Sequence, residues 1–66
     1  MNRVKGYRIM LGMTQKEMAD VIGVSINTYR DMEDNPDKFR VDQANKFLEA
    51  VNKVDGTITL NDIFLN

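Results

Sequence analysis

Residues 14–33 read TQKEMADVIGVSINTYRDME and contain two short helical patterns separated by a single glycine. Thr14 and Glu17 have the spacing of a capping box, in which the threonine hydroxyl accepts from the Glu17 N–H and the glutamate reaches back to the Thr14 N–H. The first helix should therefore begin at Thr14. It should stop at Gly23, because glycine readily takes the positive φ that ends a helix. Its predicted inner face consists of Met18, Ala19 and Ile22.

The second pattern begins at Ser25, a good N-cap residue, and predicts a helix that runs to about Glu33. Tyr29 and Met32 are its inward pair by three-residue spacing, with Ile26 one turn earlier. Pro36 follows shortly after, and the residue before a proline avoids the helical region, so the helix must end by then. This helix carries polar residues where an ordinary core helix would be apolar. Its outer face is therefore available for a purpose other than folding.

The short connection between these two helices specifies a sharp corner. Gly23 lets the first helix stop abruptly, and the small side chain of Ala19 lets the second helix approach closely. Two helices joined by a short turn that contains glycine form a helix-turn-helix, whose second helix can enter the major groove of DNA. These features specify the corner but leave its use open.

Helical spacing also predicts structure on both sides of the corner. A helix over about residues 2–11 should end at Gly12. The polar segment 34–40 should be a loop anchored by Phe39. A further helix is predicted over about residues 41–52 from a single apolar stripe. The inner positions of the first of these helices are Val4, Tyr7 and Leu11, and the stripe of the last consists of Val41, Ala44, Phe47, Leu48 and Val51.

The last ten residues allow two interpretations. Alternation in residues 57–60 makes a strand conceivable, but a cap at Asn61 and the apolar spacing of Leu60 and Ile63 favour a short terminal helix. No repeat, low-complexity segment or internal linker is visible. We therefore expect residues 1–66 to form a single all-α domain, a compact arrangement of four or five short helices.

Composition sets limits on function. With 66 residues, of which 42% are hydrophobic and 29% charged, the chain has the composition of one small soluble domain. The net charge of −1 and the pI of about 5.2 argue against bulk attraction to polyanions, so any contact with nucleic acid must depend on local charge. No apolar run has the length of a signal peptide or a membrane span. We expect a cytoplasmic protein.

An enzyme is hard to reconcile with this sequence. It contains no histidine and no cysteine, which removes the usual soft metal ligands and the commonest nucleophile–base pairs. It also lacks a glycine-rich phosphate loop, and a domain of this size has little room for a buried pocket with convergent polar groups. We therefore predict a protein that is not an enzyme and has no cofactor and no metal.

Residues 12–33, GMTQKEMADVIGVSINTYRDME, resemble the helix-turn-helix of phage repressor and Cro-type proteins, the XRE family. The family pattern is G-h-T-Q-x-x-h-A-x-x-h-G-h-S, where h is hydrophobic, followed by a helix that ends in a hydrophobic residue and glutamate. The resemblance implies a lambda repressor-like fold and a DNA-binding regulator. One departure is Tyr29, where the family usually has an aliphatic residue, and its hydroxyl needs a partner if it fills the core.

The resemblance also implies roles for individual residues. Gln15 matches a glutamine that reaches a phosphate and braces the recognition helix. Arg8 and Glu33 match a pair that links the first helix of the domain to the end of the recognition helix. Lys38 and Arg40 follow that helix, where we expect them to flank the groove. The positions that the family uses for contacts with bases or backbone are Ser25, Ile26, Asn27, Arg30 and Asp31.

The chemistry of these positions fits base recognition. Asn27 could pair with adenine and Arg30 with guanine or a phosphate, while Ile26 could contact a thymine methyl group. The alternatives are that Ile26 extends the core and that Asn27 and Arg30 are merely solvated. For Asp31, which could accept from cytosine, a solvated side chain is the better interpretation. The residues that we interpret as structural are Arg8, Thr14, Glu17, Ala19, Gly23 and Glu33.

These observations predict a sequence-specific DNA-binding transcriptional regulator, phage repressor-like or Cro-like, with residues 25–33 in the major groove. Its partner would be a double-stranded DNA operator in the nucleoid of a bacterial or phage-infected cell. The alternative is that the fold serves as a protein-binding module of the antitoxin-like or anti-regulator kind, which the near-neutral charge supports. The C-terminal segment is the candidate surface for a homodimer, through Ile58, Leu60, Phe64 and Leu65.

Overall fold

The structure is a computed structural model that describes residues 3–64. Within this range it contains five α-helices, one short 3₁₀ helix and no strand, so the predicted all-α fold is confirmed. Residue 2, where the sequence predicts the start of the first helix, lies outside the described residues. The helices are α1 (Arg3–Met10), α2 (Gln15–Ile22), α3 (Ile26–Asp34), η1 (Pro36–Lys38), α4 (Val41–Asn52) and α5 (Leu60–Phe64).

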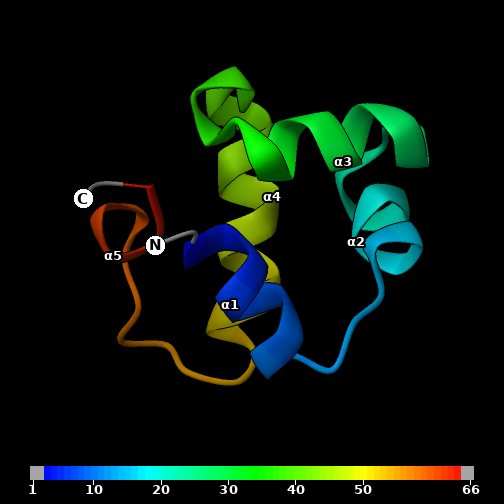
Figure 1. Ribbon diagram of the computed structural model, residues 1–66. Coiled ribbons are helices and arrows are strands. Elements are labelled where there is room, and N and C mark those ends of the chain that lie inside the picture. The colour runs from blue at the N-terminus through cyan, green and yellow to red at the C-terminus, as the bar shows by residue number, and fades with distance from the viewer. Residues whose placement is uncertain (1–2, 65–66) are drawn as a thin grey trace.

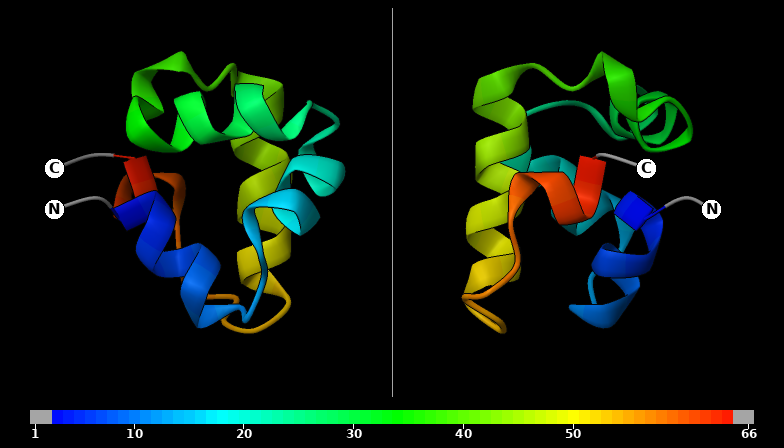
Figure 2. Two further views of the ribbon diagram at one scale, coloured as in Figure 1. Left: turned by 45° about the vertical axis from the view of Figure 1, so that its right-hand side comes forward. Right: turned by 90° about the vertical axis from the view of Figure 1, so that its left-hand side faces the viewer.

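α4 runs along one side of the domain, as the view turned by 90° in Figure 2 shows, and it faces α2 and α5 (Figure 1 and Figure 2). α2 and α3 pack against each other at the corner, α4 contacts α2 and α5, and α1 contacts α5. α3 lies at one end of the molecule, whereas the second half of α4 and the connection between α1 and α2 lie at the opposite end (Figure 1 and Figure 2). No helix in the described range is long and apolar enough to cross a membrane.

The corner between α2 and α3 has the local geometry that its sequence predicts. The Thr14 hydroxyl accepts from the Glu17 N–H at 3.1 Å, and the Glu17 carboxylate accepts from the Thr14 N–H at 2.9 Å, so both bonds of the capping box are present. Gly23 ends α2 in the left-handed region with a φ of 88°. The Ser25 hydroxyl accepts from the Thr28 N–H at 3.2 Å and so caps α3.

The core is made by residues from all five α-helices. The residues predicted to face inward from α2 are at most 3% exposed, as are Tyr29 and Met32 of α3. Ile26, predicted one turn before that pair, is only half-buried. Phe39 lies between η1 and α4, and its ring centroid is 5.9 Å from that of Phe47 and 5.0 Å from that of Phe64, in edge-on contacts. It anchors this segment as predicted. The buried hydrophobic residues are Val4, Met18, Ala19, Ile22, Tyr29, Met32, Phe47, Val51 and Ile63.

The predicted stripe of α4 is wrong at its first residue. Val41 is 76% exposed, whereas Gln43 is 8% exposed and takes an inward position. The reason is helical spacing: Gln43 lies four residues before Phe47 and eight before Val51, so it shares their face, and Val41 does not. A buried glutamine is tolerated here because its Oε1 accepts a hydrogen bond from the Arg40 N–H at 3.0 Å.

The terminal helix is present, but its predicted cap is wrong. Thr59, and not Asn61, precedes α5: its hydroxyl accepts from the Asp62 N–H at 3.3 Å, and the Asp62 carboxylate accepts from the Thr59 N–H at 2.8 Å. This is the reciprocal bonding of a capping box, with aspartate in place of glutamate. Asn61 is exposed in the first turn. The earlier start places three helical residues before Ile63, which enters the core.

Candidate nucleic-acid interface

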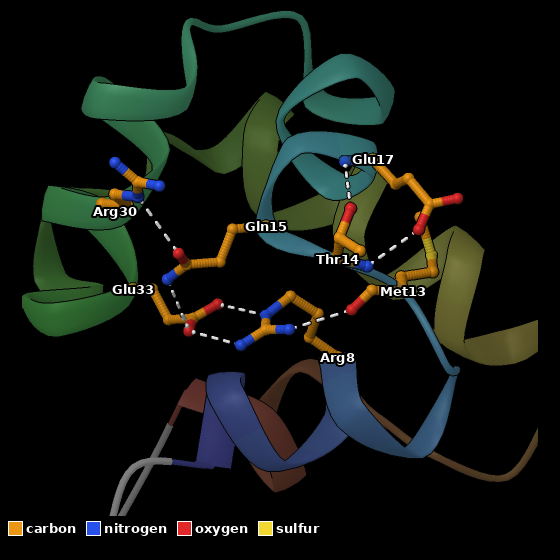
Figure 3. A network of polar contacts seen from close by, with 7 residues as sticks. All are labelled: Arg8, Met13, Thr14, Gln15, Glu17, Arg30 and Glu33. Atoms are coloured by element: carbon orange, nitrogen blue, oxygen red, sulfur yellow. Dashed lines mark hydrogen bonds and ion pairs between the residues drawn. The ribbon is translucent and has the colours of Figure 1, made fainter.

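A buried ion pair connects the inner side of α3 to α1. Arg8 of α1 is 9% exposed, and Glu33 near the end of α3 is 2% exposed. Their side chains form two hydrogen bonds, Nε–Oε2 at 2.8 Å and Nη2–Oε1 at 3.1 Å (Figure 3). Arg8 also donates from Nη1 to the Met13 carbonyl at 2.9 Å. The guanidinium therefore ties α3 both to α1 and to the connection that leads into α2.

Both members of this pair remain charged near neutral pH. Burial alone would raise the pKa of Glu33, but hydrogen bonds, above all those from Arg8, hold that pKa below its usual range. The hydrogen bond to Glu33 in turn raises the pKa of Arg8. Each charge is neutralised by the other, which is the condition under which charged groups tolerate burial.

Gln15, the first residue of α2, connects this buried pair to the surface of α3. Its Nε2 donates to Oε1 of Glu33 at 3.3 Å, and its Oε1 accepts from Nε of Arg30 at 3.2 Å (Figure 3). The two neighbours fix the orientation of the amide, because a carboxylate only accepts and a guanidinium only donates. A polar chain therefore runs from Arg8 through Glu33 and Gln15 to Arg30. Sequence spacing does not reveal it, since these partners meet only in the folded chain.

The outer face of α3 carries side chains that are exposed or half-buried and make few contacts within the domain. Asn27 and Arg30 are exposed and lie three residues apart, on one side of the helix. The Asn27 side chain makes no hydrogen bond within residues 3–64. Arg30 uses only its Nε, and its terminal nitrogens point away from that bond (Figure 3). Ile26 is half-buried but lies outside the core cluster, and the exposed Ser25 uses its hydroxyl as the cap of α3.

Lys38 and Arg40, which follow α3, each have a carboxylate partner. Nζ of Lys38 lies 2.7 Å from Oδ2 of Asp31, and Nε of Arg40 lies 3.2 Å from Oδ1 of Asp42. These hydrogen bonds raise the pKa of both cations and lower the pKa of both carboxyl groups. All four side chains are more than half exposed, so each pair is weak and is screened by salt. No acidic residues between 3 and 64 gather as a metal site would require.

The contact between Asp31 and Lys38 is one that sequence reasoning missed. It spans the end of α3 and the turn η1, which Pro36 begins with its fixed φ. The sequence predicts only a polar loop over this segment, and a loop gives no reason to bring residues seven apart together. The proline after an asparagine is the signal that could have indicated a short helical turn.

Tyr29, the departure from the family pattern, is fully buried. Its hydroxyl makes no hydrogen bond of normal distance and angle within the described residues. Burial raises the pKa of the phenol, and interaction with the nearby Glu33 carboxylate raises it further. The hydroxyl therefore stays protonated, and Tyr29 serves the core through its ring.

The predicted dimer surface is largely used inside the domain. Ile58 and Phe64 are half-buried and pack against the core, Leu60 is half-buried, and Leu65 lies outside the described residues. The most exposed large hydrophobic side chains lie on other elements. They are Ile9, Met10, Val21, Val41 and Val54.

Comparison with known proteins agrees with this geometry. A family model described as helix-turn-helix matches residues 4–56, which is most of the chain. No curated protein and no solved structure matches the sequence significantly. The matched range contains the corner between α2 and α3 and both members of the buried ion pair. The chain therefore belongs to the helix-turn-helix family of the XRE and Cro type.

Proposed function

We propose that this protein is a sequence-specific DNA-binding transcriptional regulator, phage repressor-like or Cro-like. α3 acts as the recognition helix in the major groove, and α2 crosses the DNA backbone. The observation that carries the proposal is the contrast within α3. Its inner residues are buried, while Asn27 and the terminal nitrogens of Arg30 have no partner that would occupy them in the described residues.

Arg30 and Asn27 suit different bases. Arg30 can donate from its two terminal nitrogens to O6 and N7 of guanine, and Asn27 can pair with N6 and N7 of adenine. A correct contact of this kind discriminates by about 1–3 kcal/mol per base pair. Ile26, half-buried at the start of α3, suits a thymine methyl group. A small set of side chains on α3 is therefore sufficient to select a short sequence.

Contacts with the DNA backbone would come from the start of α2 and from the segment after α3. The N-terminus of α2, where Gln15 lies, offers backbone N–H groups and partial positive charge to a phosphate. Lys38 and Arg40 can exchange their carboxylate partners for phosphates, because exposed ion pairs cost little to break. In the free protein these carboxylates offset the cations and so limit attraction to random DNA.

Salt-dependent binding to duplex DNA tests the proposal. We expect the logarithm of the binding constant to fall linearly with the logarithm of salt concentration, with a slope of about −0.9 per phosphate contact. Fluorescence anisotropy of a labelled duplex measures it. Arg30→Ala should weaken binding, whereas Lys53→Ala, which removes a cation at the opposite end of the molecule, should leave the affinity nearly unchanged.

Two outcomes would overturn the proposal. A folded protein that binds no duplex at low salt would show that the corner does not contact DNA, and the fold would then serve as a protein-binding module. Equal weakening by Arg30→Ala and Lys53→Ala would show that binding follows total charge and not α3. Circular dichroism of each variant establishes that it is folded.

We further propose that two copies bind one operator, with their recognition helices about one DNA turn, roughly 34 Å, apart. Ile58 and Leu60 keep part of their apolar surface accessible and are the candidate contacts. Sedimentation of the protein with a selected duplex should show two chains per duplex, and Leu60→Glu should reduce this to one. A single bound chain for the unmodified protein would contradict the dimer.

A further inference from the structure

An apolar groove of about 460 Å³ lies on the molecule between α2, the second half of α4 and the connection between α1 and α2. Two of the most exposed large hydrophobic residues line it, Val21 at 43% and Val54 at 65% exposure. Leu11, Met13 and Ala50 supply the rest of its apolar lining. An apolar surface that folding leaves open in this way is a candidate interaction site.

The groove also carries the unpaired cations of the described chain. Lys46 lines it from α4 and Lys53 from the residue that follows α4, and neither ammonium group makes a hydrogen bond or ion pair within residues 3–64. Each of the other seven lysines and arginines has a bond or electrostatic partner. Glu49 lies between the two lysines on the same side of α4 and can offset one of them. The groove is therefore apolar with an excess of positive charge at its edge.

We propose that this groove binds an amphipathic helix of a partner protein, with an apolar stripe that enters the groove and acidic residues that meet Lys46 and Lys53. Seven residues of helix separate the two lysines by about 10 Å, which is close to two helical turns. A helix that lies along α4 therefore matches them with carboxylates at positions i and i+7. The apolar lining of the groove supplies most of the contact, as in other helix-in-groove complexes.

A second copy of this chain fits the groove less well. In a two-fold dimer the same surface meets itself, so the lysines of both copies would come together at one interface. Like charges that face each other at an interface are unfavourable. A partner that supplies acidic groups removes this conflict and adds counter-charge beyond the single carboxylate of Glu49.

The position of the groove makes this contact compatible with DNA. Recognition helix α3 lies at one end of the molecule, and the second half of α4 with the connection between α1 and α2 lies at the other (Figure 1 and Figure 2). A helix in the groove would leave α3 accessible. The proposal goes beyond DNA binding and does not depend on it, since the groove is a property of the folded chain alone.

Synthetic peptides of about 14 residues, or four helical turns, provide the probe. One peptide carries leucine at i, i+3 and i+7 with glutamate on both sides of this stripe. A second has lysine in place of every glutamate, and a third has the composition of the first in scrambled order. Each is titrated into the isotope-labelled full chain and followed by nuclear magnetic resonance. We expect the acidic peptide to shift the signals of Val21, Ala50 and Val54 and to bind about tenfold more tightly than the lysine peptide.

The double variant Lys46→Glu, Lys53→Glu should reverse the preference between the acidic and the lysine peptide. Both side chains are exposed and unpaired, so the variant should fold, which its amide spectrum will show. Lys16→Glu, a charge reversal at an exposed lysine that does not line the groove, should leave the preference unchanged. Anisotropy with duplex DNA measures DNA binding separately, so a failure of one proposal does not conceal the other.

Three results would overturn the groove proposal. The first is that the three peptides bind equally or not at all to the folded chain. The second is that the acidic peptide shifts signals outside the groove only. The third is that the groove signals move with protein concentration in the absence of peptide, which would show that a second copy occupies this surface.

Discussion

The inner and outer faces of α3 are built from the same short helix but differ in what their side chains contact. On the inner face Tyr29, Met32 and Glu33 are at most 3% exposed. On the outer face Asn27 and Arg30 are exposed, and most of their polar atoms have no partner within residues 3–64. One helix can therefore stabilise the corner through one face and leave the other face for recognition.

The two faces are joined at one side chain. Gln15 bonds to Glu33 on the inner side and to Arg30 on the outer side. Substitutions on the inner face should therefore change the free energy of unfolding, those on the outer face should change DNA affinity, and a change at Gln15 should alter both.

The largest effect is expected on the inner face. Glu33→Gln removes the charge that neutralises Arg8 and should lower the free energy of unfolding by about 3–5 kcal/mol, because the guanidinium is then buried without a counter-charge. Urea denaturation followed by circular dichroism measures this. Asp34→Asn changes the next residue, an exposed carboxylate, and should cost about 0.5 kcal/mol or less. A similar small loss for Glu33→Gln would show that the pair does not hold α3.

The same pair predicts a pH dependence. The pKa of Glu33 is lower in the folded chain than its ordinary value of 4.5, so the stability that it contributes is present above that pH and is lost as the pH falls through the folded pKa. The difference in unfolding free energy between the unmodified protein and Glu33→Gln should be constant near neutral pH and shrink in acid. Denaturation curves over a pH series measure it. A difference that grows in acid would contradict the assignment.

On the outer face the expected effect is on binding. Arg30→Ala should weaken binding to the preferred duplex by about 1–3 kcal/mol, or roughly 5- to 150-fold, and should relax the preference at one base pair. Its free energy of unfolding should change by no more than about 0.5 kcal/mol, because the side chain is exposed. Anisotropy and denaturation on the same sample compare the two. If Arg30→Ala lowers the free energy of unfolding but leaves DNA affinity unchanged, the outer face contributes to stability and not to DNA binding, which contradicts the assignment.

Gln15→Ala tests the connection between the faces. Loss of its two hydrogen bonds should lower the free energy of unfolding by about 1 kcal/mol. It should also weaken DNA binding with little change in sequence preference, because the amide acts on the backbone and on the position of Arg30. Binding to the preferred duplex and to a shuffled duplex separates affinity from preference. If only one of stability and affinity changes, the two faces are independent.

The smallest effect is expected at Tyr29. Tyr29→Phe removes a buried hydroxyl that has no hydrogen bond of normal geometry, so the free energy of unfolding should change by less than about 1 kcal/mol and can rise. DNA affinity should be unchanged. Thermal denaturation measures the difference. A loss comparable to that of Glu33→Gln would show that the hydroxyl belongs to the buried ion pair.

Sequence reasoning was sufficient for the parts of the fold that depend on neighbouring residues. Thr14 with Glu17, Gly23 and Ser25 act within one helical turn, so their residue types specify the corner directly. It failed where the choice depends on tertiary contacts. The hydrophobicity of Val41 predicts that it faces the core. Gln43 takes the inward position because it lies one helical turn before Phe47 and its side chain is hydrogen-bonded. At α5, both threonine and asparagine are good caps, and packing of the helix selected the threonine.

The candidate site was predictable in its residue types but not in its contacts. The sequence indicates which polar residues lie on α3, because helical spacing assigns them to one face. It does not indicate that Lys38 and Arg40 carry carboxylate partners or that Gln15 bridges two charged groups. Those contacts depend on how a turn and two distant helices meet. The groove beside α4 is likewise formed by three separate segments.

The most direct test of the division between the two faces is selection of bound sequences from a random duplex pool, carried out with the unmodified protein and with Arg30→Ala. We expect the unmodified protein to enrich a palindrome with half-sites one DNA turn apart, and the variant to lose the preference at one position of each half-site. A folded protein that enriches no sequence, or a variant that enriches the same one, would contradict the assignment of the outer face of α3 to DNA.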